Sequence, residues 1–473
     1  MLQRPDFSRR AVIVPLIVAC GLFMEQLDSM IIATALPAIA RSLDEPPLRL
    51  SLAITSYLLS VATFIPVSGW IADRFGARRV FRSAIVVFTL GSLFCAASQT
   101  MTQLVVSRVL QGIGGAMMTP VGRLVLLRQV EKEEIVSAMS YLAIPALFAP
   151  LVAPPIGGFI ATYSSWRWIF LINLPIGVIG HWAVGRFIDE VPVPRPPPLD
   201  WRGWLLIAPA LASLVFALES VGKQVMATTV LWELAVVGAL LLCIYIVRAA
   251  SRPGGIVDVS LLKLPTFRVS ISGGSLFRMT VGGYILLMPL MLQLGFGRSA
   301  LQSGLITFSG AIGALTLKTS APIIVRRYGF RKLLIGNTFL CCATLLGCGA
   351  FRSGVPAVLM SLFLLAGGFF RSLQFTCVNA LAYSEMPAAR MSSATTFAST
   401  AQQLSLSMGV CLSSQLLAWS LAYGGHSHLE RADFMFAFWS LAVLTLVPLL
   451  IYRRMPVDAG AEVSGHRAAG QMP

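Results

Sequence analysis

Residues 69–79 read Gly-Trp-Ile-Ala-Asp-Arg-Phe-Gly-Ala-Arg-Arg and stand between two long apolar segments. Each flanking segment is about 20 residues long, which is the length that an α-helix needs to cross a bilayer. Loops rich in positive charge stay in the cytoplasm, so the arginines of this turn, with Arg82 just after it, predict a cytoplasmic turn. The stretch therefore indicates a helical membrane protein and suggests its orientation.

The composition of the whole chain supports an all-α membrane protein. Of 473 residues, 56% are hydrophobic and 12% are charged, and the mean hydropathy is +0.79. Soluble domains carry about 25% charged residues, roughly twice this share. The net charge of +16 does not indicate nucleic-acid binding, because the basic residues are spread over short loops rather than gathered in one patch.

The apolar segments predict about fourteen spans, arranged as two six-helix bundles with an inserted helix pair between them. A weak internal repeat supports two related halves, because residues 323–332 echo the turn at 69–79, with Gly329 in the place of Gly76. The expected divisions are an N-terminal bundle at 1–192, a linker with the inserted pair at 193–262, a C-terminal bundle at 263–455 and a disordered cytoplasmic tail at 456–473.

The basic residues of the loops test the orientation. If the N-terminus is inside, 24 basic residues fall in cytoplasmic loops and tails and 7 fall in outer loops. This bias predicts that both termini are cytoplasmic, which requires an even number of spans.

The first span contains two acidic residues, Glu25 and Asp28, that lie three residues apart and share one helix face. A carboxylate inside a membrane is costly, so it is a functional hypothesis by default, and here it suggests proton exchange. The alternative is a structural acid paired with a neighbouring arginine.

Two stretches resemble motifs of one transporter family. Residues 69–79 resemble the loop between helices two and three of major facilitator superfamily transporters, and Leu27 to Pro37 resembles the first helix of the fourteen-helix drug:proton antiporter branch (EmrB/QacA type), with Met30 in place of the usual threonine. The resemblance covers nearly the whole chain and implies a major facilitator fold in the bacterial inner (cytoplasmic) membrane. It also implies a conformational gate at the matching residues of the turn, which are Gly69, Asp73, Arg74, Gly76, Arg78 and Arg79.

The run from Ser107 to Ala116 resembles a further motif of the same superfamily, R-x-x-Q-G-x-G-[GA]-A. Its Arg108 stays charged in any environment, so we expect it to tune a nearby acid or to order a polar network. With Asp28 and Glu25 it forms the expected proton-coupling set. In the alternative, Arg108 reaches the outer interface and the motif serves packing, for which Gly112 and Gly115 allow close helix contact.

Residues 153–158 read Ala-Pro-Pro-Ile-Gly-Gly and resemble the antiporter signature G-P-x-x-G-G, which the family associates with export. Ala153 replaces the first glycine of that signature, so the direction of transport stays open. We expect Pro154 to bend this helix, and Gly157 and Gly158 to let a neighbouring helix approach.

Basic residues inside the spans indicate the class of substrate. Arg278 and Arg371 lie near mid-span, where an uncompensated arginine costs about 3 kcal/mol, and such cations outnumber the deep acids. This balance favours an anionic or carboxylate-bearing substrate, such as an organic acid or its metal chelate. Arg371 and Gln374 are expected to share a face and to hold a carboxylate by forked hydrogen bonds, with Asn379 nearby. The full set of expected substrate-binding residues is Arg278, Arg371, Lys318, Gln374, Asn379, Tyr57 and Arg123.

These features predict a transporter rather than an enzyme. The chain has no nucleotide-binding loop of the type G-x-x-x-x-G-K-[ST] and no legible catalytic set, and its eight cysteines lack metal-ligand spacing, so no metal or cofactor is expected. We expect a monomer in the lipid bilayer that exports small molecules in exchange for protons. The alternatives are a proton-coupled uptake symporter on the same fold and a ligand-binding sensor without transport. The need for a periplasmic adaptor stays open.

Overall fold

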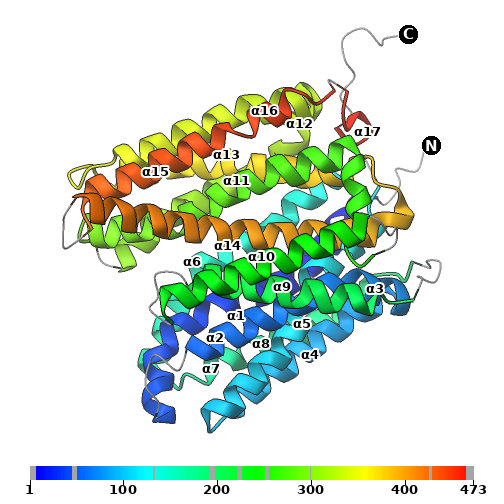
Figure 1. The fold of residues 1–473 in the computed structure, drawn as a ribbon, viewed down its shortest axis with the longest axis horizontal. Coiled ribbons are helices and arrows are strands. Elements are labelled where there is room, and N and C mark those ends of the chain that lie inside the picture. Colours follow the sequence, from blue (N-terminus) through cyan, green and yellow to red (C-terminus); the bar gives the residue numbers. More distant parts are fainter. Residues whose placement is uncertain are drawn as a thin grey trace.

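The computed structural model describes residues 7–44, 51–131, 134–191, 198–220, 226–250, 255–298, 300–424, 429–456 and 458–464. Within these ranges the regular structure is entirely helical, as the sequence predicts (Figure 1). The first group of helices, drawn in blue and cyan, comprises α1 (Phe7–Leu43), α2 (Ser51–Phe64), η1 (Ile65–Val67), α3 (Ser68–Phe75), α4 (Ala77–Ala97), α5 (Met101–Gln129), α6 (Ile135–Tyr163), α7 (Trp168–Leu171) and α8 (Asn173–Phe187).

Two further helices, α9 (Trp201–Ser220) and α10 (Thr228–Ala250), follow the first group. The short helix η3 (Val259–Lys263) then leads into the last group. This group comprises α11 (Pro265–Leu290), η4 (Met291–Gly295), α12 (Ala300–Ala350), α13 (Ala357–Ser384), η5 (Ala388–Arg390), α14 (Met391–Gly424), α15 (Arg431–Leu446), α16 (Leu449–Tyr452) and α17 (Ala461–Ser464).

Within the described ranges, twelve helical segments are long and apolar enough to cross a membrane. Two more helical stretches of comparable length stand beside them, α6 with 29 residues and the first part of α12 before its bend. An α-helix rises about 1.5 Å per residue, so segments of this length match a bilayer core of about 30 Å. The helices thus agree with the predicted count of about fourteen.

Two glycines make the tight turns that the sequence repeat predicts. Gly76 joins α3 to α4 with φ +92°, and Gly329 bends α12 with φ +68°. Both angles lie in the left-handed region, which a residue with a Cβ rarely adopts. A Cβ on Gly76 would also lie 2.0 Å from Oε1 of Glu190.

The first and last groups meet close to the α3–α4 turn, at the end of the molecule that we call the arginine-rich end because it contains Arg74, Arg78 and Arg79. The hydroxyls of Ser68 and Thr396 lie 3.3 Å apart across this interface. A Cβ on Gly69 would lie 2.5 Å from Oγ1 of Thr396, so only glycine lets α3 and α14 approach so closely.

Of the two inserted helices, α9 lies against both groups and α10 packs against α9 (Figure 1). The indole nitrogen of Trp204 on α9 donates a hydrogen bond to the carbonyl oxygen of Thr63, at 3.0 Å, and this residue belongs to α2. Leu211 of α9 packs in one apolar cluster with Ala62 of α2 and Leu404 of α14. α9 therefore bridges the two groups rather than standing apart from them.

The segment after α16 differs from the expected disordered tail. Its residues 458–464 form a turn and α17, and Val463 is 3% exposed because it packs into the main apolar cluster. The rest of the expected tail, from residue 465, lies outside the described residues.

Candidate functional site: a buried ion pair and an arginine-rich interface

Asp28 of α1 lies at the centre of a buried polar cluster. Its Oδ2 accepts a hydrogen bond of 2.5 Å from Nη1 of Arg108, and neither side chain is exposed. Its Oδ1 accepts hydrogen bonds from the side-chain amides of Gln111, at 2.9 Å, and Asn173, at 2.8 Å. Both carboxylate oxygens are therefore held by donors from α5 and α8. This is the arginine pairing that the sequence left open as the alternative for this acid.

Arg108 is held on several sides. Its Nε donates to the carbonyl oxygen of Ala53 at 3.1 Å, and Nη1 also lies 2.6 Å from Oε1 of Gln111. Its guanidinium stacks over the ring of Tyr57, 4.4 Å from the ring centre. Tyr57, an expected substrate contact, thus lies against Arg108, and stacking of this kind helps to stabilise a buried cation.

Asn173 and Ser92 belong to the cluster but are not among the expected site residues. The amides of Gln111 and Asn173 both donate to Oγ of Ser92, at 2.7 and 3.1 Å. Asn173 precedes Leu174 and Pro175 in a stretch that also looks typical of the family, which is a signal that could have identified it. Ser92 has no comparable signal, because isolated serines are common in membrane helices.

The two glycines expected in helix packing bring α2 and α5 together beside this cluster. A Cβ on Gly112 would lie 2.7 Å from Cβ of Ser60, and one on Gly115 would lie 2.7 Å from the hydroxyl oxygen of Tyr57. Ser60 in turn donates a hydrogen bond of 2.8 Å to the carbonyl oxygen of Val109. Small residues here allow the close approach that places Tyr57 against Arg108.

Glu25 lies one helical turn before Asp28 and is held differently. It is 9% exposed, and its Oε2 accepts a hydrogen bond of 3.0 Å from the hydroxyl of Thr119. Within the described part of the chain it has no cationic partner. The two acids of α1 therefore differ: Asp28 is compensated by an arginine, and Glu25 is held by a hydroxyl.

Asp73 of the expected gate links the two groups of helices. It forms a 2.7 Å ion pair with Arg128 of α5 and accepts a hydrogen bond from the hydroxyl of Ser392 on α14. Neither Arg128 nor Ser392 is an expected gate residue. Both are distant from Asp73 in the sequence, and the residues around them match no motif that would have indicated a gate.

The remaining gate residues surround the turn. Arg78 donates to the carbonyl oxygen of Gly185, and Arg79 lies 3.6 Å from a carboxylate oxygen of Glu190. Arg74 is exposed and has no partner among the described residues. These arginines anchor or flank the turn, whereas Asp73 alone among them makes a described hydrogen bond between the two groups.

Two of the expected substrate-binding arginines come together where the groups meet. Arg123 of α5 donates to the hydroxyl of Tyr383, at 3.3 Å, and to the side chain of Gln402, at 3.2 Å. Arg278 of α11 donates to Oδ1 of Asn379 at 2.9 Å and lies close enough to Arg123 for the two charges to repel. Nε and Nη1 of Arg278 and Nε of Arg123 are buried without a hydrogen-bond partner in the described part of the protein.

Arg371 and Gln374, which are expected to hold a carboxylate together, contact different neighbouring residues. Gln374 faces α12, where its side chain bonds to Asn337 at 2.9 Å and to Thr338 at 3.1 Å. Arg371 stacks instead on the ring of Tyr284, 3.6 Å from the ring centre. A spacing of three residues places side chains on similar faces, but the neighbouring helices decide what each one contacts.

Three expected positions lie outside the described side chains, namely Lys318, Pro154 and Gly158. Gly157 is described and is buried in α6. Among the described residues, no group of three or more histidine, cysteine, aspartate or glutamate side chains is arranged to hold a metal ion.

Comparison with known proteins places this architecture in a family. The family model described as the Major Facilitator Superfamily matches residues 18–410. A protein of Salmonella typhi named "Putative multidrug resistance protein MdtD" is 37% identical over 461 residues, which is 97% of each chain. The protein of the same name from Salmonella newport (strain SL254) is 36% identical over the same shares.

Solved structures share the fold. The proton:xylose symporter XylE superposes with a TM-score of 0.65 at 16% identity, covering 97% of this chain and 99% of its own. The human organic anion transporter MFSD10 (TETRAN) superposes with a TM-score of 0.62 at 14% identity, covering 95% and 100%. The predicted all-α major facilitator fold is therefore confirmed, and the chain belongs to the major facilitator superfamily as a membrane transporter, not an enzyme.

Proposed function

We propose that this chain exports small molecules in exchange for protons, by alternating access between its two six-helix bundles. The observation that carries the proposal is the buried cluster in which Arg108 pairs with Asp28, with the second acid, Glu25, one turn away. Charged groups in a membrane interior mark ion pathways, so a paired and an unpaired acid on one helix suit a protein that takes up and releases protons.

The two acids have different roles in this proposal. Asp28, which accepts hydrogen bonds from three donors, joins α1, α5 and α8. Glu25 takes up the proton, because its described partner is the hydroxyl of Thr119 and no cation among the described residues pairs with it. A proton on Glu25 would remove a negative charge one helical turn from Asp28 and so change the electrostatic surroundings of the Asp28–Arg108 pair.

The direction of transport rests on the relatives. Proteins named for multidrug resistance, 36–37% identical over nearly the whole chain, favour export of small molecules. The proton:xylose symporter shares the fold at 16% identity, which supports the fold alone. Uptake by symport is therefore an outcome of the test rather than a second proposal.

The substrate is proposed to be anionic or to carry a carboxylate. Arg123 and Arg278 lie together between the groups and retain buried guanidinium nitrogens without a described partner. Unpaired buried donors of this kind are costly, and a carboxylate is the natural acceptor for a guanidinium. A substrate bound here would contact both groups of helices and so would sense their relative movement.

Asp73 and its partners are proposed to form the inner gate. With the bundles at 1–192 and 263–455 and the inserted pair at 193–262 between them, the contacts of Asp73 with Arg128 and Ser392 would hold the arginine-rich end closed. The charge bias of the loops supports placing this end, and both termini, in the cytoplasm of a bacterial inner membrane. We propose a monomer as the working unit.

Flux in oriented proteoliposomes under an imposed pH gradient tests the proposal. Labelled anionic, neutral and cationic compounds are supplied to the wild type and to the Glu25→Gln and Arg278→Gln variants. The proposal is supported if the pH gradient drives anionic compounds from the side that the cytoplasmic face of the protein contacts to the opposite side, and if both variants lose this movement. Movement with the proton would assign uptake, saturable binding without flux would assign a sensor, and a preference for cations would contradict the substrate class.

A further inference from the structure

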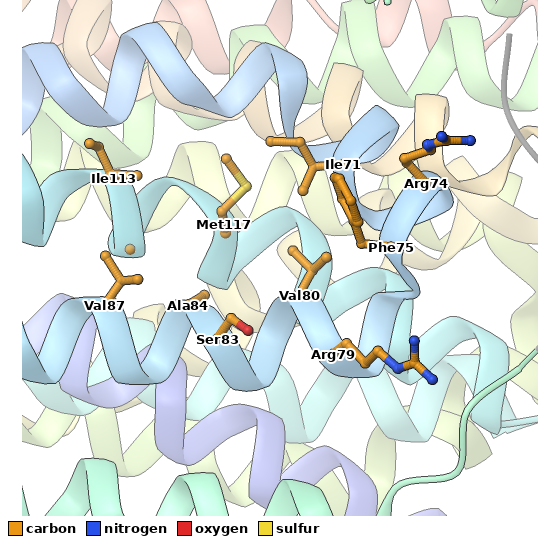
Figure 2. Close-up of a pocket in the computed structure, with 11 residues that line it drawn as sticks. Ile71, Arg74, Phe75, Arg79, Val80, Ser83, Ala84, Val87, Ile113 and Met117 are labelled. Atoms are coloured by element: carbon orange, nitrogen blue, oxygen red, sulfur yellow. The ribbon is translucent and has the colours of Figure 1, made fainter. Parts of the chain in front are cut away.

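A groove runs along the outer wall of the first group of helices, between α3, α4 and α5 (Figure 2). Its volume is about 480 Å³, within the range of sites that hold small molecules. Exposed Phe75, Arg79 and Ser83 on its rim show that the groove opens to the surface. It is separate from the Asp28 cluster and from the Arg123–Arg278 interface, neither of which contributes to its lining.

The groove is cationic at one end and apolar along the rest of its length. Figure 2 shows Arg74 and Arg79 at one end of the groove, on opposite sides of it, and Val87 and Ile113 at the other end. Between them the walls are apolar apart from Ser83. Eight residues of α4 separate Arg79 from Val87, so the apolar part extends about 12 Å along the helix axis. The shape and polarity suit an amphiphile with an anionic head and a hydrocarbon chain.

Both arginines are available to an anion. Arg74 is exposed and has no partner among the described residues. Arg79 lies 3.6 Å from Glu190, but its side chain is 80% exposed, and an ion pair so open to solvent is weak. Arg79 thus has one weak carboxylate partner and Arg74 has none among the described residues, which leaves a net positive charge at this end of the groove.

The surface beside the groove is apolar, which indicates the source of the amphiphile. Val86 and Leu90 on α4 and Val106 and Val109 on α5 are exposed, as expected for helix faces in contact with lipid. Basic side chains at the edge of a span attract anionic lipid head groups. We propose that the groove binds an anionic membrane phospholipid, with its phosphate between Arg74 and Arg79 and one acyl chain along Val80, Val87 and Met117. This site depends neither on the transported substrate nor on the direction of transport.

Native mass spectrometry of the delipidated full-length protein tests the proposal, with dioleoylphosphatidylglycerol, dioleoylphosphatidylcholine and glycerol 1-phosphate as probes. The wild type should retain phosphatidylglycerol in preference to phosphatidylcholine. Arg74→Gln with Arg79→Gln should weaken phosphatidylglycerol binding by roughly 25-fold, since each basic residue near an anionic surface contributes about fivefold. Ser83→Trp, which fills the groove from an exposed position, should weaken binding of both lipids.

Two control variants separate this site from general effects. Ser83→Ala changes the same position without filling the groove, and Arg327→Gln removes an exposed arginine from the corresponding turn of the last group. Both should bind phosphatidylglycerol as the wild type does. The proposal is overturned if Arg327→Gln weakens binding as much as the double variant, if Ser83→Trp leaves it unchanged, or if glycerol 1-phosphate displaces the lipid at equal concentration.

Discussion

Asp28 on α1 and Arg108 on α5 form a 2.5 Å ion pair in which neither side chain is exposed. The second carboxylate oxygen of Asp28 is bonded by Gln111 and Asn173, so the pair joins α1, α5 and α8. A buried charge that loses its partner costs about 3–5 kcal/mol, so a change of charge at Asp28 would affect the packing of all three helices.

Replacing Asp28 with Asn should therefore destabilise the protein by about 3–5 kcal/mol, because it leaves Arg108 as an uncompensated buried cation. A lowered apparent unfolding temperature in detergent would show this. The double variant Asp28→Asn with Arg108→Gln should recover part of the loss, since it removes the orphaned charge as well. Equal stability of Asp28→Asn and the wild type would refute the structural role of the pair.

Replacing Gly112 with Ala should destabilise the contact between α2 and α5. The added Cβ would lie 2.7 Å from Cβ of Ser60 and 2.8 Å from the backbone oxygen of Tyr57, and overpacking of this kind costs about 1–3 kcal/mol. Gly336→Ala is the matched control, because a Cβ there meets no atom within 4 Å and alanine favours a helix by up to about 1 kcal/mol. Thermal unfolding should move in opposite directions for the two variants.

Replacing Asp73 with Asn should slow transport without weakening substrate binding. The substitution removes the ion pair with Arg128 and alters the hydrogen bond from Ser392, and both contacts lie at the proposed gate and not at Arg123 or Arg278. Turnover in proteoliposomes and the Kd of the purified protein measure the two effects separately. Ser392→Ala should show a smaller loss of turnover, because the Arg128 pair remains. A matching loss of affinity in Asp73→Asn would contradict the assignment.

The loop that follows the inserted helices makes a pH-dependent contact with η5, directly before α14. Asp258 lies 2.6 Å from Arg390 and accepts hydrogen bonds from Ser260. Partial burial raises the pKa of Asp258, but the hydrogen bonds of Ser260 and Arg390 and the charge of Arg390 outweigh burial and hold this pKa below its usual range.

A lowered carboxyl pKa stabilises the fold above the pKa of the unfolded chain, about 3.9, and this contribution is lost as the pH falls through the lower folded value. The unfolding temperatures of the wild type and Asp258→Asn should therefore differ by a constant amount from pH 8 to about pH 5 and converge below about pH 4. The pair is partly exposed, so the difference should be at most about 1 kcal/mol. Arg390→Gln, which keeps the cap on Ser260, should lose less; a difference that grows as the pH falls would refute the assignment.

The sequence predicts the helices and the two glycine turns well. Membrane-spanning helices can be predicted from the sequence because the backbone groups of an apolar segment in a bilayer must form hydrogen bonds within the segment. A long apolar segment therefore forms an α-helix. The turn at Gly76 and its counterpart at Gly329 were predictable for a similar reason, since both need a backbone angle that glycine adopts easily.

The partners of the site residues were not predictable from the sequence. Ser92, Arg128 and Ser392 contact the expected residues from helices that are distant in sequence, and nothing in their own surroundings marks them. The different neighbours of Arg371 and Gln374, which are expected to hold a carboxylate together, were not predictable for the same reason. Helical periodicity gives the angle between two side chains, but not which helix packs against each.

Proton-coupled flux through the Glu25→Gln variant tests the central claim most directly. Purified protein in liposomes is given an imposed pH gradient, and uphill movement of an anionic substrate is compared with its exchange at equal concentrations on both sides. We predict that Glu25→Gln retains exchange but no longer moves substrate uphill, because the group that takes up the proton is gone. Uphill movement by Glu25→Gln at the wild-type rate would contradict the account.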